Sequence, residues 1–221
     1  MAVDDARRAP GVLDPLELAA PAPVIPVIVL QRADDAVPLA RTLVAGGIRV
    51  LEVTLRTPAA LAAIEAIARS VPGAIVGAGT VRSGVDARAA HAAGARFAVS
   101  PGWSAHVADA CRSLGLALLP GVATASEVMA AVEGGHRFLK FFPAGASGGT
   151  ALLRAWASPF ADVVFCPTGG IDAQSAPDYL ALANVAVVGG SWLTPPEAIA
   201  AGDWIRVERL AREAANLSRG V

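Results

Sequence analysis

Short apolar runs alternate with longer amphipathic runs along almost the whole chain. The short runs are rich in Val and Ile and show little strict alternation, as expected for strands that are covered on both faces. Between them, longer Ala- and Leu-rich runs carry apolar residues at helical spacing. The short runs span residues 24–31, 49–55, 75–80, 96–101, 116–122, 137–142, 162–168 and 185–191.

Several of the predicted helices have recognisable ends. Thr57 precedes a proline and forms an N-cap with proline at the first helical position. Thr124 and Glu127 have the spacing of a capping box, and Ser83 and Asp86 have a weaker form of it. Glycines suited to ending a helix follow four of the runs, at Gly46, Gly94, Gly115 and Gly134.

Strand runs that alternate with helices predict parallel β–α–β units. Eight such units in ~200 residues fit a closed (β/α)8 TIM barrel at the small end of its size range. An open doubly wound sheet is the alternative, but its first strand would be followed by a Gly-x-Gly-x-x-Gly turn, and residues 31–35 contain no glycine. We expect one domain over residues 1–221, with residues 1–13 as a loose arm and Asp14 to Ala20 as a short helix that closes the barrel bottom.

Composition narrows the class of protein. The chain has 221 residues, of which 54% are hydrophobic and 17% charged, so it is not disordered. Its longest apolar stretch, Val24 to Leu30, falls far short of the ~18 residues of a membrane span. The net charge of −1 argues against nucleic-acid and anionic-membrane partners and leaves a small molecule. A polar N-terminus and only two cysteines, Cys111 and Cys166, predict a cytoplasmic protein.

One of the 18 basic residues is a lysine, Lys140, and all the others are arginines. Arginine never deprotonates, whereas a lysine amine can act in its neutral form. Phe138 and Phe142 share the strand face of Lys140, and desolvation there disfavours the ammonium form. The sequence therefore indicates a nucleophilic amine. The structural alternative is a lysine at a strand end that reaches solvent.

Polar residues interrupt the apolar run at 49–55. With a period of two, Glu52, Thr54 and Arg56 share one face of the predicted strand. A carboxylate in a buried strand is costly unless it is paired or functional, and polar strand ends in a barrel indicate an active site. The structural alternative is a salt bridge between Glu52 and an arginine inside the barrel.

Glycine-rich loops follow the last two strand runs. Gly169 and Gly170 follow the seventh run, and Gly190 and Ser191 follow the eighth. Loops at these two places commonly bind a phosphate in barrel enzymes, because glycine lets backbone N–H groups approach the ligand. The alternative is ordinary turn chemistry.

The other strand ends add little chemistry. Thr80 offers a hydroxyl at the barrel mouth, and small residues around Pro101 leave room for a ligand. His91, His106 and His136 have no metal-ligand spacing, so we expect no metal and no cofactor.

Taken together, six segments resemble the 2-keto-3-deoxy-6-phosphogluconate (KDPG) and 4-hydroxy-2-oxoglutarate (KHG) aldolase family, the class I aldolases of the Entner–Doudoroff pathway. The resemblance covers about Pro23 to Ala214, with the motifs in the family order. It implies a metal-independent lyase that forms a homotrimer. The segments are LEVTLRT (51–57), GAGTV (77–81), SPG (100–102), KFFPA (140–144), CPTGG (166–170) and GGSW (189–192).

The resemblance also implies a role for each matching residue. Lys140 would form the Schiff base, and Glu52 would be the general acid and base, acting through a bound water. Arg56 and Thr80 would hold the pyruvate carboxylate, with Phe142 beside the imine. The phosphate would be bound by Gly169, Gly170, Gly190 and Ser191, with Thr168 and Pro101 shaping the pocket and its stereochemistry.

The expected reaction is cleavage of 2-dehydro-3-deoxy-6-phosphogluconate to pyruvate and D-glyceraldehyde 3-phosphate, and of 4-hydroxy-2-oxoglutarate to pyruvate and glyoxylate. Three alternatives are an aldolase for the 6-phosphogalactonate epimer, a metal-dependent aldolase and a non-catalytic barrel that binds sugar phosphates. Gly145 stands where the family often has Glu, so we expect changed loop packing or substrate range there.

Overall fold

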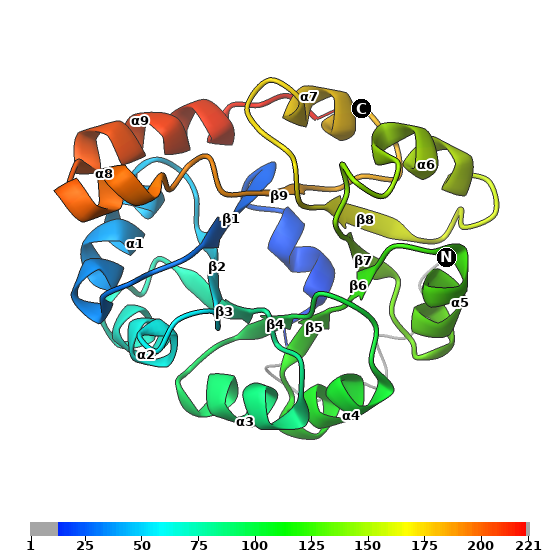
Figure 1. Ribbon diagram of the computed structural model, residues 1–221, viewed down its shortest axis with the longest axis horizontal. Helices are drawn as coiled ribbons and strands as arrows, with labels where there is room; N and C mark the ends of the chain where they lie inside the picture. The colour runs from blue at the N-terminus through cyan, green and yellow to red at the C-terminus, as the bar shows by residue number, and fades with distance from the viewer. Residues whose placement is uncertain (1–12, 220–221) are drawn as a thin grey trace.

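The strands are parallel and lie around the centre of the molecule, with the α-helices outside them (Figure 1). The computed structural model describes residues 13–219. In that range the strands are β1 (Val24–Ile28), β2 (Val50–Thr54), β3 (Ile75–Gly79), β4 (Phe97–Val99), β5 (Ala117–Leu119), β6 (Gly121–Val122), β7 (Phe138–Phe141), β8 (Val164–Pro167) and β9 (Val188–Gly190).

Helices connect successive strands, as the alternating pattern predicts. Two 3-10 helices are η2 (Pro15–Ala19) and η3 (Ala33–Asp35). The α-helices are α1 (Ala36–Ala45), α2 (Ala60–Ser70), α3 (Gly84–Ala92), α4 (Ala105–Leu114), α5 (Ala125–Glu133), α6 (Gly149–Trp156), α7 (Ala176–Leu180), α8 (Pro196–Ala201) and α9 (Trp204–Ala215). Among the described residues, no helix is both long and apolar enough to cross a membrane.

The strands pair in two sheets. One has six strands in the order β5-β4-β3-β2-β1-β9, and the other has three in the order β6-β7-β8. First and last strands are thus neighbours, which is not the order of a doubly wound sheet. The α/β class with parallel strands is confirmed.

Pro120 divides one predicted strand run into β5 and β6. Proline has no N–H to donate to a ladder, but the Pro120 carbonyl accepts a bond from the Lys140 N–H at 2.8 Å. The same run therefore pairs with β4 before Pro120 and with β7 after it. On the other side, an isolated parallel bridge from Thr168, just after β8, to Gly189 of β9 links the two sheets, and a second bridge joins Phe165 of β8 to Val185, which precedes β9.

Some of the predicted helix ends are confirmed. Thr124 and Glu127 form a complete capping box at α5, and the Ser83 hydroxyl accepts a bond from the Asp86 N–H at α3. The prediction for Thr57 is wrong. α2 begins at Ala60, and the Thr57 hydroxyl instead donates to the carbonyl of Leu30, at the end of β1.

An apolar cluster separate from the strand–helix core fills the interior of the strand arrangement. We call it the inner cluster; it comprises Leu13, Leu18, Ala19, Ile25, Val50, Phe97, Val99, Ala117, Leu119, Phe138, Cys166 and Val187. Leu18 of η2 is fully buried in it, so this short N-terminal helix closes one end, as predicted (Figure 1). The predicted loose arm lies outside the described residues except for Leu13, which packs into the inner cluster.

We expect Leu18→Ala to lower the free energy of unfolding by about 2–5 kcal/mol, because it leaves a cavity in the inner cluster. Urea denaturation would measure the change. Leu16→Ala is the matched control, since the Leu16 side chain in the same helix is 48% exposed; its effect should stay within about 0.5 kcal/mol. Equal losses for both variants would contradict a closing role for Leu18.

Candidate active site

A buried ion pair between Glu52 and Lys140 lies on the inner side of the strands. Glu52 belongs to β2 and Lys140 to β7, and the Lys140 Nζ lies 3.3 Å from the Glu52 Oε1. Their side chains are 4% and 5% exposed. A buried charge is tolerated only with a partner, and the partner of Glu52 is this lysine and not an arginine, as the structural alternative would require.

Glu52 and Lys140 are each held in place by pairing with a strand on both sides. Glu52 lies between Val27 of β1 and Gly77 of β3, and Lys140 lies between Gly121 of β6 and Cys166 of β8. Because the side-chain period of a strand is two, Glu52 follows Val50 and Lys140 follows Phe138 on the inward faces. Val50 and Phe138 both belong to the inner cluster, so apolar side chains lie directly beneath the ion pair.

The buried Lys140 amine lies near an aromatic ring as well as its carboxylate partner. Its Nζ lies 5.2 Å from the centre of the Phe142 ring. Cys166, in register with Lys140, is fully buried, and burial raises the pKa of its thiol to about 12, although Lys140 acts in the opposite direction. The thiol therefore stays neutral near pH 7, and the amine is the group suited to nucleophilic attack.

Arg56 and Thr80 meet at the ends of β2 and β3. The Arg56 Nε donates to the Thr80 Oγ1 at 3.1 Å. Thr80 has a φ of 61°, the left-handed region that a β-branched residue rarely adopts. Thr54, which was expected to share a strand face with Glu52 and Arg56, is fully buried, and its hydroxyl donates to the Ile28 carbonyl at 3.0 Å. The Thr54 hydroxyl therefore links β2 to β1 by a hydrogen bond.

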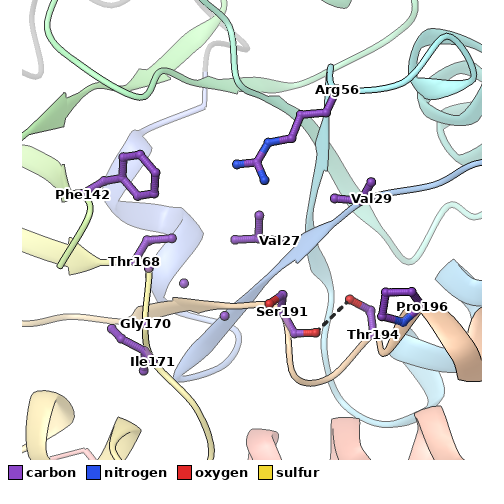
Figure 2. A pocket seen from close by; sticks show the side chains of 13 residues that line it. Val27, Val29, Arg56, Phe142, Thr168, Gly170, Ile171, Ser191, Thr194 and Pro196 are labelled. Atoms are coloured by element: carbon purple, nitrogen blue, oxygen red, sulfur yellow. Dashed lines mark hydrogen bonds between the residues drawn. The ribbon is translucent and has the colours of Figure 1, made fainter. Parts of the chain in front are cut away.

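A pocket of about 290 Å³ opens at the carboxyl ends of the strands. Figure 2 shows the Arg56 guanidinium directed into it, opposite Phe142 and Thr168. Seven predicted site residues line it: Arg56, Phe142, Thr168, Gly169, Gly170, Gly190 and Ser191. Lys140 and Glu52 do not line it. They lie deeper, since Phe142 is two residues beyond Lys140 along the strand, or about 6.6 Å.

Two other predicted site residues, Thr80 and Pro101, are not among the residues that line this pocket. Thr80 lies beside it, in contact with Arg56. Pro101 is half-buried and its backbone packs against Gly121 of β6, where a Cβ would lie 2.5 Å from the Pro101 carbonyl carbon.

Sequence reasoning missed several of the residues that line the pocket. They are Val27, Val29, Ile171, Gly189, Thr194 and Pro196. Val27 and Val29 belong to the first predicted strand run and look like ordinary strand residues, so no sequence signal distinguishes them. Thr194 had a usable signal, as a hydroxyl three residues after Ser191; it is buried, and its Oγ1 donates to the Ser191 carbonyl at 3.3 Å (Figure 2).

Gly145 contacts the glycine loop that follows β8. Its N–H donates to the Gly169 carbonyl at 2.9 Å, and the residue is exposed. A Cβ here would meet Gly169 and Gly170 at ordinary contact distances, the nearest being 3.5 Å. The departure from the family pattern therefore lies directly beside the pocket rim.

The histidines take no part in the site. His91 and His106 are exposed, and His136 packs edge-on against Trp103 with 5.4 Å between ring centres. Burial lowers the pKa of His136, and the charge of Arg112 lowers it further. Among residues 13–219, no group of three or more His, Cys, Asp and Glu residues could hold a metal ion.

An amine and a carboxylate buried beneath a pocket at the carboxyl ends of parallel strands define an enzyme-like site for covalent amine chemistry. A family model described as KDPG and KHG aldolase matches residues 17–210. The chain belongs to the KDPG and KHG aldolase family.

Individual relatives cover most of the chain. A 2-dehydro-3-deoxy-phosphogluconate aldolase from Pseudoalteromonas atlantica is 51% identical over 90% of this chain and 93% of its own length. A KHG/KDPG aldolase from Escherichia coli K12 is 52% identical over 87% and 90%. The crystal structure of a KDPG aldolase from Legionella pneumophila, with pyruvate captured at low pH as a covalent carbinolamine intermediate, is 46% identical with a TM-score of 0.90, covering 92% of this chain and 99% of that chain.

We expect both cysteines to resist thiol reagents in the folded protein. Burial raises the pKa of Cys166 to about 12 and that of Cys111 to about 11. At pH 8 the thiolate fraction of Cys166 should be roughly 10³-fold below that of an exposed thiol. Ellman's reagent would measure this, with Ser158→Cys as an exposed control. Native labelling of Cys166 at the control's rate would contradict its burial beside Lys140.

Proposed function

We propose that this protein is a class I aldolase. It cleaves 2-dehydro-3-deoxy-6-phosphogluconate to pyruvate and D-glyceraldehyde 3-phosphate, and also 4-hydroxy-2-oxoglutarate to pyruvate and glyoxylate. The observation that carries the proposal is the buried contact of 3.3 Å between Glu52 and the only lysine of the chain. The names of the relatives at about half identity support the same substrates.

In this mechanism the Glu52 carboxylate accepts a proton from Lys140 and leaves a neutral amine. The amine attacks the C2 ketone of the substrate, and the protonated Glu52 then gives its proton to the carbinolamine hydroxyl, which leaves as water. This step forms the iminium and restores the Glu52 carboxylate. Glu52, through a bound water, then removes the C4 hydroxyl proton, and the C3–C4 bond breaks with its electrons moving into the iminium. Protonation of the enamine and hydrolysis release pyruvate and restore Lys140.

The pocket supplies the binding groups. Arg56 and Thr80 hold the carboxylate next to the imine, and Phe142 packs beside it. At the other side of the pocket, backbone N–H groups of the glycine loops and the Ser191 hydroxyl bind the phosphate. Those loops are Gly169 and Gly170 after β8, and Gly190 and Ser191 at the end of β9, with Thr168 setting the stereochemistry at C4.

We further propose that residues 1–221 form one domain whose two sheets act as a single closed (β/α)8 barrel. Pro120 joins the sheets on one side, and the bridge from Thr168 to Gly189 joins them on the other. The family resemblance supports a homotrimer, which sedimentation of the purified chain would measure. Two free, buried cysteines suit a reducing compartment, in keeping with a cytoplasmic enzyme.

The aldolase for the phosphogalactonate epimer remains the second candidate, because the site would use the same lysine and glutamate. The Thr168 region faces the carbon at which the epimers differ. Relative turnover on the two phosphorylated epimers and on 4-hydroxy-2-oxoglutarate separates the candidates. Absence of turnover on all three would leave the non-catalytic sugar-phosphate binder.

Borohydride should trap pyruvate on Lys140 as a stable secondary amine. Peptide mass spectrometry should place the adduct at Lys140 in one-to-one yield. Lys140→Arg should abolish trapping and turnover although it keeps the charge, because a guanidinium is not a nucleophile at neutral pH.

The matched control for this experiment is Arg137→Lys, which adds a half-exposed lysine three residues away. It should acquire no adduct at position 137, alone or combined with Lys140→Arg. An active Lys140→Arg variant, or an adduct confined to the α-amino group, would overturn the Schiff-base mechanism.

Ser191→Ala should raise KM for the phosphorylated substrate roughly tenfold, the scale of a lost hydrogen bond to a charged group. Gly170→Val should raise it further, because Gly170 has a φ of 73° and a side chain there would block the backbone approach. Steady-state kinetics on 4-hydroxy-2-oxoglutarate, which has no phosphate, is the control and should change by less than about twofold. Equal losses on both substrates would make these loops structural.

A further inference from the structure

Gly79 is the last residue of β3 and lies beside the ion pair. It is in register with Thr54 of β2, two residues beyond the pairing of Glu52 with Gly77. Its φ lies outside the left-handed region, so the backbone there does not require glycine. What is specific about Gly79 is therefore the space that its missing side chain leaves.

The Glu52 side chain fills that space. A Cβ on Gly79 would lie 2.7 Å from the Glu52 Cγ and 2.9 Å from its Cδ, and closest of all to Oε1, the atom that contacts Lys140. Carbon atoms in proteins pack at about 3.5–4.0 Å. With Glu52 only 3% exposed and enclosed by its strand neighbours, an added methyl group must displace the carboxylate.

We infer that Gly79 is a positioning residue, whose missing side chain sets the place of the Glu52 carboxylate relative to the Lys140 amine. Its effect on catalysis rests on the proposed function, because it acts through Glu52. The distance that it controls is the 3.3 Å contact between Oε1 and Nζ.

Gly77, two residues earlier on the same face of β3, has a different neighbour. A Cβ there would lie 2.5 Å from the Phe97 Cγ and nearer still to other ring atoms. Phe97 belongs to the inner cluster and is fully buried. Alanine at 77 thus disturbs apolar packing, whereas alanine at 79 disturbs the ion pair. The two glycines form a matched pair for an experiment.

Gly79→Ala should reduce kcat on 2-dehydro-3-deoxy-6-phosphogluconate by roughly 10- to 100-fold, since displacing a catalytic group by about 1 Å costs up to ~10²-fold. KM should change by less than about threefold, because the phosphate loops belong to β8 and β9. The Tm should fall as well, because a displaced carboxylate weakens a buried ion pair, so the loss of kcat is what distinguishes this variant. Gly77→Ala should lower the Tm clearly while its folded fraction keeps kcat within about threefold.

A second variant tests whether the loss acts through Glu52. Glu52→Asp keeps the carboxylate but shortens the side chain, which relieves the contact with a methyl group at position 79. We compare kcat values relative to the wild type. The relative kcat of the double variant with Gly79→Ala should exceed the product of the relative kcat values of the two single variants by at least about fivefold. The pH–rate profile of Gly79→Ala should also differ from that of the wild type. If Gly79→Ala fails to fold, the double variant should restore folding.

A wild-type kcat and pH profile in folded Gly79→Ala would overturn the inference, as would strictly multiplicative losses or a double variant that also fails to fold. A wild-type enzyme that neither cleaves the substrate nor traps pyruvate would overturn the proposed function instead. In that case a crystal structure of Gly79→Ala decides the inference: the Glu52 Oε1 must lie beyond about 4 Å from the Lys140 Nζ, outside ion-pair range, and an unchanged contact refutes it.

Discussion

The arrangement of the site depends on the burial of one ammonium group and one carboxylate together. Removing either ion from water costs several kcal/mol, and only a close, well-oriented partner offsets that cost. Glu52 and Lys140 come from strands in different sheets, 88 residues apart in sequence. Their contact therefore requires the two sheets to face each other at a fixed separation. The ion pair can form only if the sheets pack at this separation, and in turn the buried charges disfavour any other packing of the sheets.

The layers above and below the pair serve different purposes. Below it, the inner cluster excludes water and holds the strands in register, with Phe138 beneath Lys140 and Val50 beneath Glu52. Above it, the pocket is lined partly by backbone, where glycines replace side chains. Gly170 illustrates the point: it lines the pocket, and a Cβ there would lie no nearer than 3.7 Å to any atom beyond its chain neighbours. The room for a ligand thus comes from missing side chains at strand ends.

The alternation of short apolar runs with longer amphipathic runs was enough to predict parallel strands and their approximate limits, and the polar residues within those runs identified Glu52 and Lys140 as candidate site residues. It could not predict that these two residues are each other's partner, because strand pairing across the interior depends on the whole fold. The split at Pro120 and the bond from Thr57 to Leu30 also escaped prediction, since each is set by a neighbouring strand. Val27 and Val29 line the pocket yet carry no local signal, because only register distinguishes a lining valine from a core valine.

The site divides into two sides with separate structural supports. Glu52, Arg56 and Thr80 depend on β2 and β3, whereas the glycine loops depend on β8 and β9. Lys140 lies between these sides, paired in register with β6 and β8. A change beside the glycine loops, such as a side chain at position 145, therefore acts on the pocket rim without moving the ion pair. Conversely, a small change beside Glu52 acts on the ion pair without moving the glycine loops. Under the proposed function, this separation lets one chemistry serve substrates with and without a phosphate.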